Sequence, residues 1–136
     1  MAANADDALL VFADGVPILN NSDFRVSSTV QIPDTCVLAI EAENFQGPRG
    51  ILASSANARV ISDVTWRCNV SDEPNWLDAS FNDSTWPLPQ VTGAHGDDPW
   101  GFFEEIHPDA VWIWSSSVGP GFAFCRKNFC EGRIFL

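Results

Sequence analysis

The sequence predicts an all-β protein folded as a single β-sandwich domain. Short apolar runs recur along the chain, and several alternate with polar residues at the period of two that marks a strand with one buried face. Most runs end at clusters of Gly, Pro, Asn, Asp or Ser, the residues typical of turns. A length of 136 residues suits one core, so residues 1–136 are expected to form one domain.

The first predicted element is a β-hairpin. Ala8–Ala13 and Val16–Leu19 flank Asp14-Gly15, a dipeptide that favours the positive backbone angles of a two-residue turn. Pro17 lacks the N–H group that a central strand needs, so the second strand is expected near a strand end or at a sheet edge. The alternation in Phe24–Ile32 then predicts a strand with one solvated face.

The clearest predicted strand is Cys36–Asn44, which is apolar and β-branched at its start. Ile51–Ala53 and Ala58–Ile61 are expected to form a hairpin around Ser54–Asn57. The next segment, Val64–Val70, also alternates. Its period places four side chains on one face: Val64, Trp66, Cys68 and Val70.

The segment Asn75–Pro87 places two tryptophans, Trp76 and Trp86, around a turn rich in Asp, Asn and Ser. These indole rings could form a sugar-stacking platform, or they could pack in the core. Prolines then exclude Pro87–Val91 from the centre of a sheet. The remaining expected elements are two strands joined by a turn at residues 116–121: Ala110–Ser115 and Phe122–Phe129.

The long connection Thr92–Asp109 is the main candidate for a ligand site. Loops of this length are uncommon in compact domains unless they are functional. Within six residues the loop gathers an imidazole, two carboxylates and an indole, which suit a sugar or cation site; a solvated lid is the alternative. We therefore expect ligand contacts from His95, Asp97, Asp98 and Trp100, together with Trp76.

The charge balance disfavours some partners. Eighteen acidic and seven basic residues give a formal charge of −11, which repels nucleic acid and anionic membrane surfaces. No apolar run approaches the roughly 20 residues of a membrane span, so no membrane insertion is expected. Hard oxygen ligands at Glu43 and Asn44, beside a Gly-rich loop, could hold a structural calcium ion, with ordinary solvation of a strand end as the alternative.

The cysteines and sequons indicate an extracellular protein. Cys36, Cys68, Cys125 and Cys130 lack the spacing of a zinc site and are expected to form disulfides, with three pairings possible. The segment Met1–Asp7 has no positively charged signal-peptide region. Three Asn-x-Ser sequons are candidate glycosylation sites: Asn20, Asn69 and Asn82.

One set of segments forms a recognisable series along the chain: Leu10–Gly15, Val37–Asn44, Gly47–Ala53, Trp66, Trp76, Phe81–Pro87, Ala110–Trp114 and Phe124–Phe129. Together, in this order, they resemble the galactose-binding-like jelly roll. The most similar members are accessory domains of α-rhamnosidase and β-galactosidase type enzymes and related lectin-like modules. The resemblance spans about Asp7 to Phe129, and Phe-Asn-Asp-Ser-Thr-Trp-Pro is its most specific motif.

This resemblance implies a jelly-roll sandwich that binds glycans, other proteins or phospholipid, and many members carry a structural calcium ion. No nucleophile constellation stands out in the sequence, so catalysis is not expected. We therefore expect a secreted, non-catalytic carbohydrate-binding or adhesion module with a glycan or glycoprotein as partner. The alternative is a structural building block of an extracellular matrix or filament that acts through protein–protein contacts, including self-association.

Overall fold

The computed structural model describes residues 1–116 and 121–130. Within them the chain forms only β-strands, turns and irregular segments, which confirms the predicted all-β class. The strands are β1 (Ala2–Asp6), β2 (Ala8–Ala13), β3 (Val16–Asn21), β4 (Ser28–Thr29), β5 (Val37–Asn44), β6 (Gly50–Ser54), β7 (Arg67–Asn69), β8 (Gln90–Ala94), β9 (Val111–Trp114) and β10 (Gly121–Asn128).

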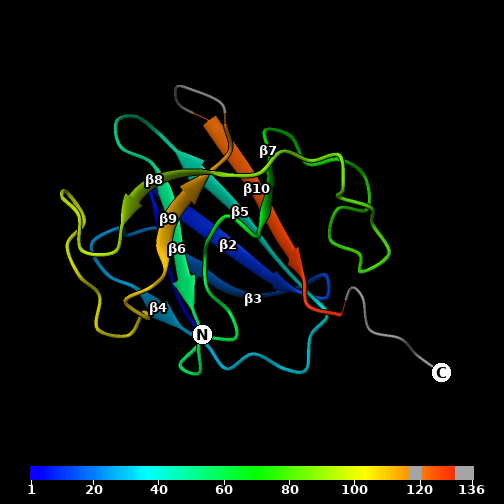
Figure 1. Cartoon of the computed structure of the whole chain (residues 1–136), viewed down its shortest axis with the longest axis horizontal. Coiled ribbons are helices and arrows are strands. Elements are labelled where there is room, and N and C mark those ends of the chain that lie inside the picture. Colours follow the sequence, from blue (N-terminus) through cyan, green and yellow to red (C-terminus); the bar gives the residue numbers. More distant parts are fainter. Residues whose placement is uncertain (117–120, 131–136) are drawn as a thin grey trace.

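The strands form two antiparallel sheets that pack as a sandwich (Figure 1). Sheet A has the strand order β4-β1-β6-β9-β8, and sheet B has the order β3-β2-β5-β10-β7. The inner faces meet in the main core, to which sheet A contributes Ala5 and Ile51 while sheet B contributes Val11 and Ile40. Alternation along each strand explains this division, because every second side chain points between the sheets.

A long loop covers the outer face of each sheet. On sheet A, Phe103 and Ile106 pack over Leu52 and Trp112. On sheet B, Trp76 and Trp86 pack over Ala39 and Phe124. The central strands are therefore partly or fully covered on both faces, and all five residues of β6 are buried because neither of its faces meets water.

The predicted first hairpin is confirmed. Strands β2 and β3 pair around Asp14 and Gly15, whose φ angles of 47° and 83° are those of a left-handed turn. Strand β3 is an edge strand, as Pro17 indicated. The prolines at 87 and 89 also precede an edge strand, β8.

Two predicted strands are much shorter than expected. In Phe24–Ile32 only β4 pairs, because Asn4 donates to the Phe24 carbonyl and Asn21 to the Val26 carbonyl in place of a neighbouring strand. Strand β7 covers only part of Val64–Val70. Its inward pair Trp66 and Cys68 is buried as predicted, whereas Val64 and Val70 are exposed.

Other boundaries also differ from the predictions. The hairpin expected for Ala58–Ile61 is a single bridge between Ser54 and Ile61, since side chains of the intervening turn bond its backbone. The loop predicted from Thr92 begins only after β8 ends at Ala94. Strand β1 was not predicted, because its small and polar residues lack an apolar pattern. Most of the turn predicted at residues 116–121 lies outside the described residues.

The two disulfides are Cys36–Cys130 and Cys68–Cys125. Cys68 and Cys125 face each other on the paired strands β7 and β10, and both are fully buried. Cys36 and Cys130 are partly exposed and join the segment before β5 to the segment after β10. This pairing excludes the short Cys125–Cys130 loop, because Cys125 lies within a continuous strand.

Candidate functional site

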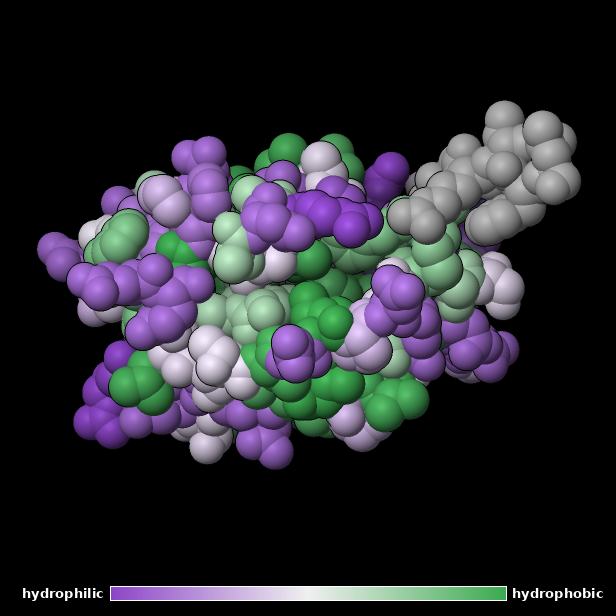
Figure 2. Space-filling view, turned by 90° about the horizontal axis from the view of Figure 1, so that it is seen from below, coloured by the Kyte–Doolittle hydropathy of each residue, from purple (hydrophilic) through white to green (hydrophobic). Residues whose placement is uncertain are grey.

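One end of the sandwich contains a cavity of about 740 Å³, within the size range of small-ligand sites. It lies between the connection that follows β4, the turn that follows β6, the start of β5 and the residue that follows β10. Figure 2 shows this end of the molecule, where hydrophobic surface gathers at the centre between hydrophilic groups. The lining residues are Met1, Thr29, Val30, Gln31, Ile32, Pro33, Asp34, Thr35, Leu38, Ser55, Ala56, Asn57, Arg59, Val60 and Phe129.

The floor of the cavity is the end of the main core. Leu38 and Val60 belong to this core, and Ile32 and Phe129 pack against it while remaining partly exposed. The Phe129 ring is fixed by an edge contact with Trp66, at 6.5 Å between centroids. An apolar surface with one held aromatic ring suits the C–H face of a sugar.

The rim of the cavity carries polar side chains that are not used internally. Gln31, Asp34 and Arg59 are exposed, and their side chains make no hydrogen bond or ion pair with the described residues. Asn57 organises its own turn, because its Oδ1 accepts from Arg59 N at 3.1 Å and from Ser55 Oγ at 2.7 Å. The rim therefore offers a carboxylate, an amide and a guanidinium to a ligand.

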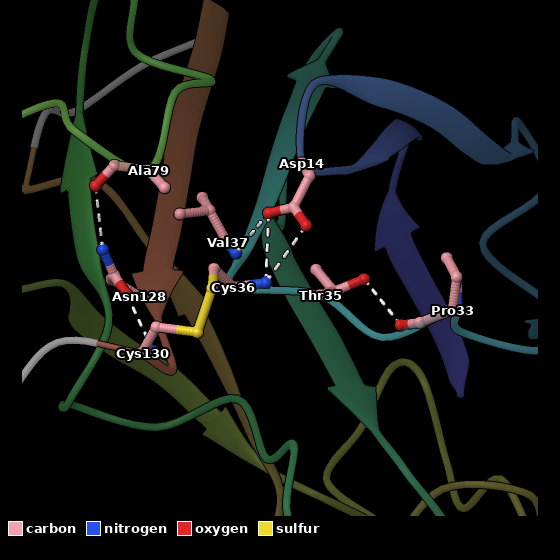
Figure 3. The surroundings of a disulfide bond; sticks show 8 residues. All are labelled: Asp14, Pro33, Thr35, Cys36, Val37, Ala79, Asn128 and Cys130. Atoms are coloured by element: carbon pink, nitrogen blue, oxygen red, sulfur yellow. Dashed lines mark hydrogen bonds between the residues drawn. A yellow bond between two sulfur atoms is a disulfide. The ribbon is translucent and has the colours of Figure 1, made fainter. Parts of the chain in front are cut away.

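The partly exposed disulfide holds two walls of this cavity together. Pro33 and Thr35 lie on one wall and Phe129 on another. The Cys36–Cys130 bond joins the residue after Thr35 to the residue after Phe129, and Figure 3 shows this bond with Thr35 and Pro33 on the segment before Cys36. Phe129 N also donates to Cys36 O at 2.7 Å. The Asp14 carboxylate accepts from the backbone N–H groups of Cys36 and Val37 and fixes the start of β5.

The predicted loop residues do not form an open ligand site. His95 uses both ring nitrogens internally: Nε2 accepts from Phe103 N at 2.9 Å, and Nδ1 lies 3.1 Å from His107 O. Asp97 accepts from Ala94 N through Oδ2 at 2.9 Å and closes a turn. Asp98 is exposed and has no partner among the described residues.

Trp100 is half-buried and packed on sheet A. Its ring stacks on Trp112 at 4.3 Å, and its Nε1 donates to Asp6 Oδ2 at 2.9 Å. The pKa of the Asp6 carboxyl is raised to about 6: burial raises it most, the neighbouring Asp7 also raises it, and the hydrogen bond from Trp100 lowers it. Trp100 thus anchors the loop on the sheet.

Trp76 cannot share a platform with Trp100. It is 7% exposed, stacks on Trp86 at 6.2 Å, and meets the edges of Phe12 and Phe124. Its contacts lie on the outer face of sheet B, whereas Trp100 lies on the outer face of sheet A. A sugar platform and packing in the core were the two alternatives for Trp76. The structure shows that Trp76 is packed.

The structure separates the two expected metal ligands. Glu43 and Asn44 are consecutive in β5, so their side chains point to opposite faces, and Asn44 is 2% exposed. Within residues 1–116 and 121–130, no three His, Cys, Asp or Glu side chains cluster as a metal site.

The three sequons differ in their surroundings. Asn20 is exposed on the edge strand β3, whereas Asn69 lies in β7 and donates to Glu73 Oε1 at 3.3 Å. Asn82 is exposed, and its Oδ1 accepts from Ser84 N at 3.0 Å. It also lines a second hollow of about 530 Å³, so a glycan on Asn82 would cover that hollow.

Sequence reasoning missed the cavity because its lining comes from segments far apart in the chain. The turn at Ser54–Asn57 was predicted, but only strand pairing brings it beside the segment before β5. The polar residues of these two segments, Asp34 and Asn57 among them, were the available signal.

Comparison with protein-family models, curated proteins and solved structures finds no match. Among the described residues, no helix has the length and apolar character needed to cross a membrane. Two disulfides indicate folding in an oxidising environment of the extracellular type.

Proposed function

We propose that this chain is a secreted, non-catalytic carbohydrate-binding module with a galactose-binding-like jelly-roll fold. The observation that carries the proposal is the cavity at the end of the sandwich, with its apolar floor and its rim of unpaired polar side chains. The sandwich architecture and the motifs around Trp76 and Trp86 support the fold assignment. The two disulfides support secretion.

The geometry of the cavity favours a neutral sugar. The partly exposed Phe129 ring and Ile32 side chain offer a surface for sugar C–H groups. Asp34 and Gln31 can accept hydrogen bonds from hydroxyl groups, and Arg59 can donate to ring or hydroxyl oxygens. A formal charge of −11 disfavours strongly anionic glycans.

A binding function fits this cavity better than hydrolysis does. Most glycoside hydrolases use two carboxyl groups on opposite sides of the scissile bond. Asp34 is the one acidic side chain among the described residues that line the cavity. The acidic pair Glu104 and Glu105 belongs to the loop on sheet A and does not line the cavity.

The test is a glycan array followed by calorimetric titration of the best neutral oligosaccharide. We expect Asp34→Ala to weaken binding by roughly 10- to 100-fold, the loss of one hydrogen bond to a charged group. Asp98→Ala is the matched control, because Asp98 is equally exposed and unpaired but lies on the loop over sheet A. Absence of binding to every glycan would remove the proposal. Loss of binding only in Asp98→Ala would move the site to that loop.

The second candidate function is a structural building block that associates through protein–protein contacts. It is favoured by exposed apolar side chains on and near the edge strand β8, where Val91 is 50% exposed, and on the adjoining loop, where Phe102 is 56% exposed. Sedimentation at micromolar concentration tests it. Self-association that Val91→Lys abolishes, without glycan binding, would favour this function over the first.

A further inference from the structure

The loop over sheet B leaves part of the outer face of that sheet open. Its tryptophans, Trp76 and Trp86, pack over the half of the face that carries Ala39. In the other half, toward the end of β5 and the start of β10, outward side chains reach solvent. We call this open half the acidic face, and its residues are Leu10, Glu41, Glu43, Phe122 and the neighbouring Asp72.

Strand pairing sets these side chains side by side. Leu10 pairs with Glu41 across β2 and β5, and Phe122 pairs with Glu43 across β10 and β5. The Phe122 ring is 43% exposed and stacks on Phe124 at 5.9 Å between centroids, which places it on the outer side of the sheet. The acidic face therefore combines an exposed aromatic ring, an aliphatic side chain and carboxylates.

The carboxylates of this face repel one another. Burial raises the pKa of the Glu41 carboxyl, and the nearby Asp72 and Glu43 raise it further. Within residues 1–116 and 121–130, none of these three side chains has a hydrogen bond or an ion pair. The buried cation of the same sheet, Arg126, is paired with Asp83. A cation supplied by another molecule relieves this repulsion.

We infer that the acidic face docks a basic, partly apolar peptide segment of another protein. Lys or Arg side chains of the segment pair with Glu41 and Glu43, and its apolar side chains contact Leu10 and Phe122. A cation placed over the Phe122 ring adds a cation–π contact. Complementary charge of this kind steers the partners together and fixes their register.

The charge of the acidic face argues against other occupants. In a symmetric dimer the same patch meets itself, so a second copy of the chain places like charges opposite one another. A neutral sugar leaves the carboxylates uncompensated, and an anionic membrane surface is repelled by them. A basic segment is the occupant whose charge matches the face.

The acidic face is separate from the proposed glycan cavity. Leu38 lines the cavity from the inner side of β5, whereas Glu43 points outward from the same strand roughly 17 Å further along, at about 3.4 Å per residue. Peptide docking is therefore independent of glycan binding, and a variant that loses one can retain the other.

Fluorescence anisotropy with a labelled peptide of alternating Lys and Leu residues tests the docking at pH 7. The double variant Glu41→Gln with Glu43→Gln is expected to weaken binding by roughly 10-fold, because each partly exposed ion pair contributes up to about fivefold. Glu104→Gln with Glu105→Gln is the matched control. It changes the net charge equally on the loop over sheet A and is expected to weaken binding by less than about twofold. Equal losses in the two double variants would show attraction to the net charge alone and would overturn the inference.

Phe122→Ala tests the apolar part of the acidic face. Its loss of ring contacts is expected to weaken peptide binding by about 2- to 5-fold. Phe102→Ala removes a ring of similar exposure on the loop over sheet A and is expected to keep full affinity. Thermal melts without peptide check that each variant is folded. Unchanged peptide affinity in Phe122→Ala would contradict docking on this face. Sedimentation that shows a dimer of the unchanged chain, lost in Phe122→Ala, would assign the face to a second copy and overturn the inference as well.

Discussion

The Trp100 indole donates its Nε1–H group to the Asp6 carboxylate at 2.9 Å, across 94 positions of sequence. The same indole stacks on Trp112 of β9, so one side chain fixes the loop both to the end of β1 and to the outer face of sheet A. The loop that carries the most polar and aromatic residues is thereby part of the packed outer layer. This explains why the open cavity lies elsewhere in the molecule.

The first prediction concerns the pH dependence of stability through Asp6. Burial raises its folded-state pKa to about 6, above the ordinary value of 3.8, so between these values the folded chain binds the proton more tightly than the unfolded chain. The stabilisation that proton binding by Asp6 gives to the folded chain is therefore fully present below about pH 4 and is lost as the pH rises through 6. We expect Asp6→Asn, which keeps an acceptor for Trp100, to be more stable than the unchanged chain at pH 7 and about equal near pH 4.

Melting temperatures measured from pH 4 to 7 in chelator would check this, with Asp98→Asn as the control. In Asp6→Asn the Tm is still expected to fall as the pH rises, but less steeply, because burial and the neighbouring Asp72 and Glu43 also raise the pKa of Glu41. If the Tm of Asp6→Asn changed with pH as steeply as that of the unchanged chain, this pH dependence could not be assigned to Asp6.

The second prediction concerns the close approach of Gly93 to Trp100. A Cβ atom on Gly93 would lie 2.8 Å from Cζ3 of the indole, and the ring cannot retreat because it already stacks on Trp112. We expect Gly93→Ala to destabilise the chain by about 1–3 kcal/mol. A double-mutant cycle in urea with Trp100→Phe would check this, since Phe lacks the clashing atom. Equal costs of Gly93→Ala in both backgrounds would show that the two positions are not coupled.

The sequence predicted the sheet-forming parts of this fold better than the layers outside them. Strand β5 and the hairpin around Asp14 and Gly15 have strong local signals, an apolar β-branched run and a turn dipeptide. The strand pattern of Phe24–Ile32 failed because Asn4 and Asn21 satisfy its carbonyls from other parts of the chain. The residue pattern within one segment carries no information on its contacts with distant segments.

Prediction of the candidate site also required information on contacts between distant segments. Clustering of His95, Asp97, Asp98 and Trp100 in sequence indicated a ligand loop, but contacts with Phe103, Ala94 and Asp6 use three of the four side chains. The cavity residues Gln31 and Asp34 are far from Arg59 in sequence, and they meet because the segment before β5 and the turn after β6 lie at the same end of the sandwich.

The third prediction concerns Arg126, which is fully buried beneath the segment that contains Trp76 and Trp86. Its guanidinium pairs with Asp83, donates to Asp78 O at 2.8 Å and Phe81 O at 3.3 Å, and lies over the Phe81 ring. Removing one partner of a buried pair leaves the other charge unpaired. We expect Arg126→Met to lose about 3–5 kcal/mol in urea unfolding and to expose Trp76 and Trp86 to a fluorescence quencher. Arg25→Met, which removes an exposed pair with Asp23, is expected to lose less than about 1 kcal/mol.

The fourth prediction concerns the order in which the disulfides are reduced. Thiol–disulfide exchange requires access of the attacking thiolate, and Cys36 and Cys130 are partly exposed whereas Cys68 and Cys125 are fully buried. In limiting dithiothreitol, alkylation and peptide mass spectrometry are expected to label Cys36 and Cys130 first. Because this bond clamps the cavity wall that carries Phe129, the partially reduced chain is expected to lose affinity for the neutral glycan proposed as its ligand while keeping its β-sheet circular dichroism. Early labelling of Cys68 and Cys125, or full glycan affinity after reduction of Cys36–Cys130, would contradict the clamp.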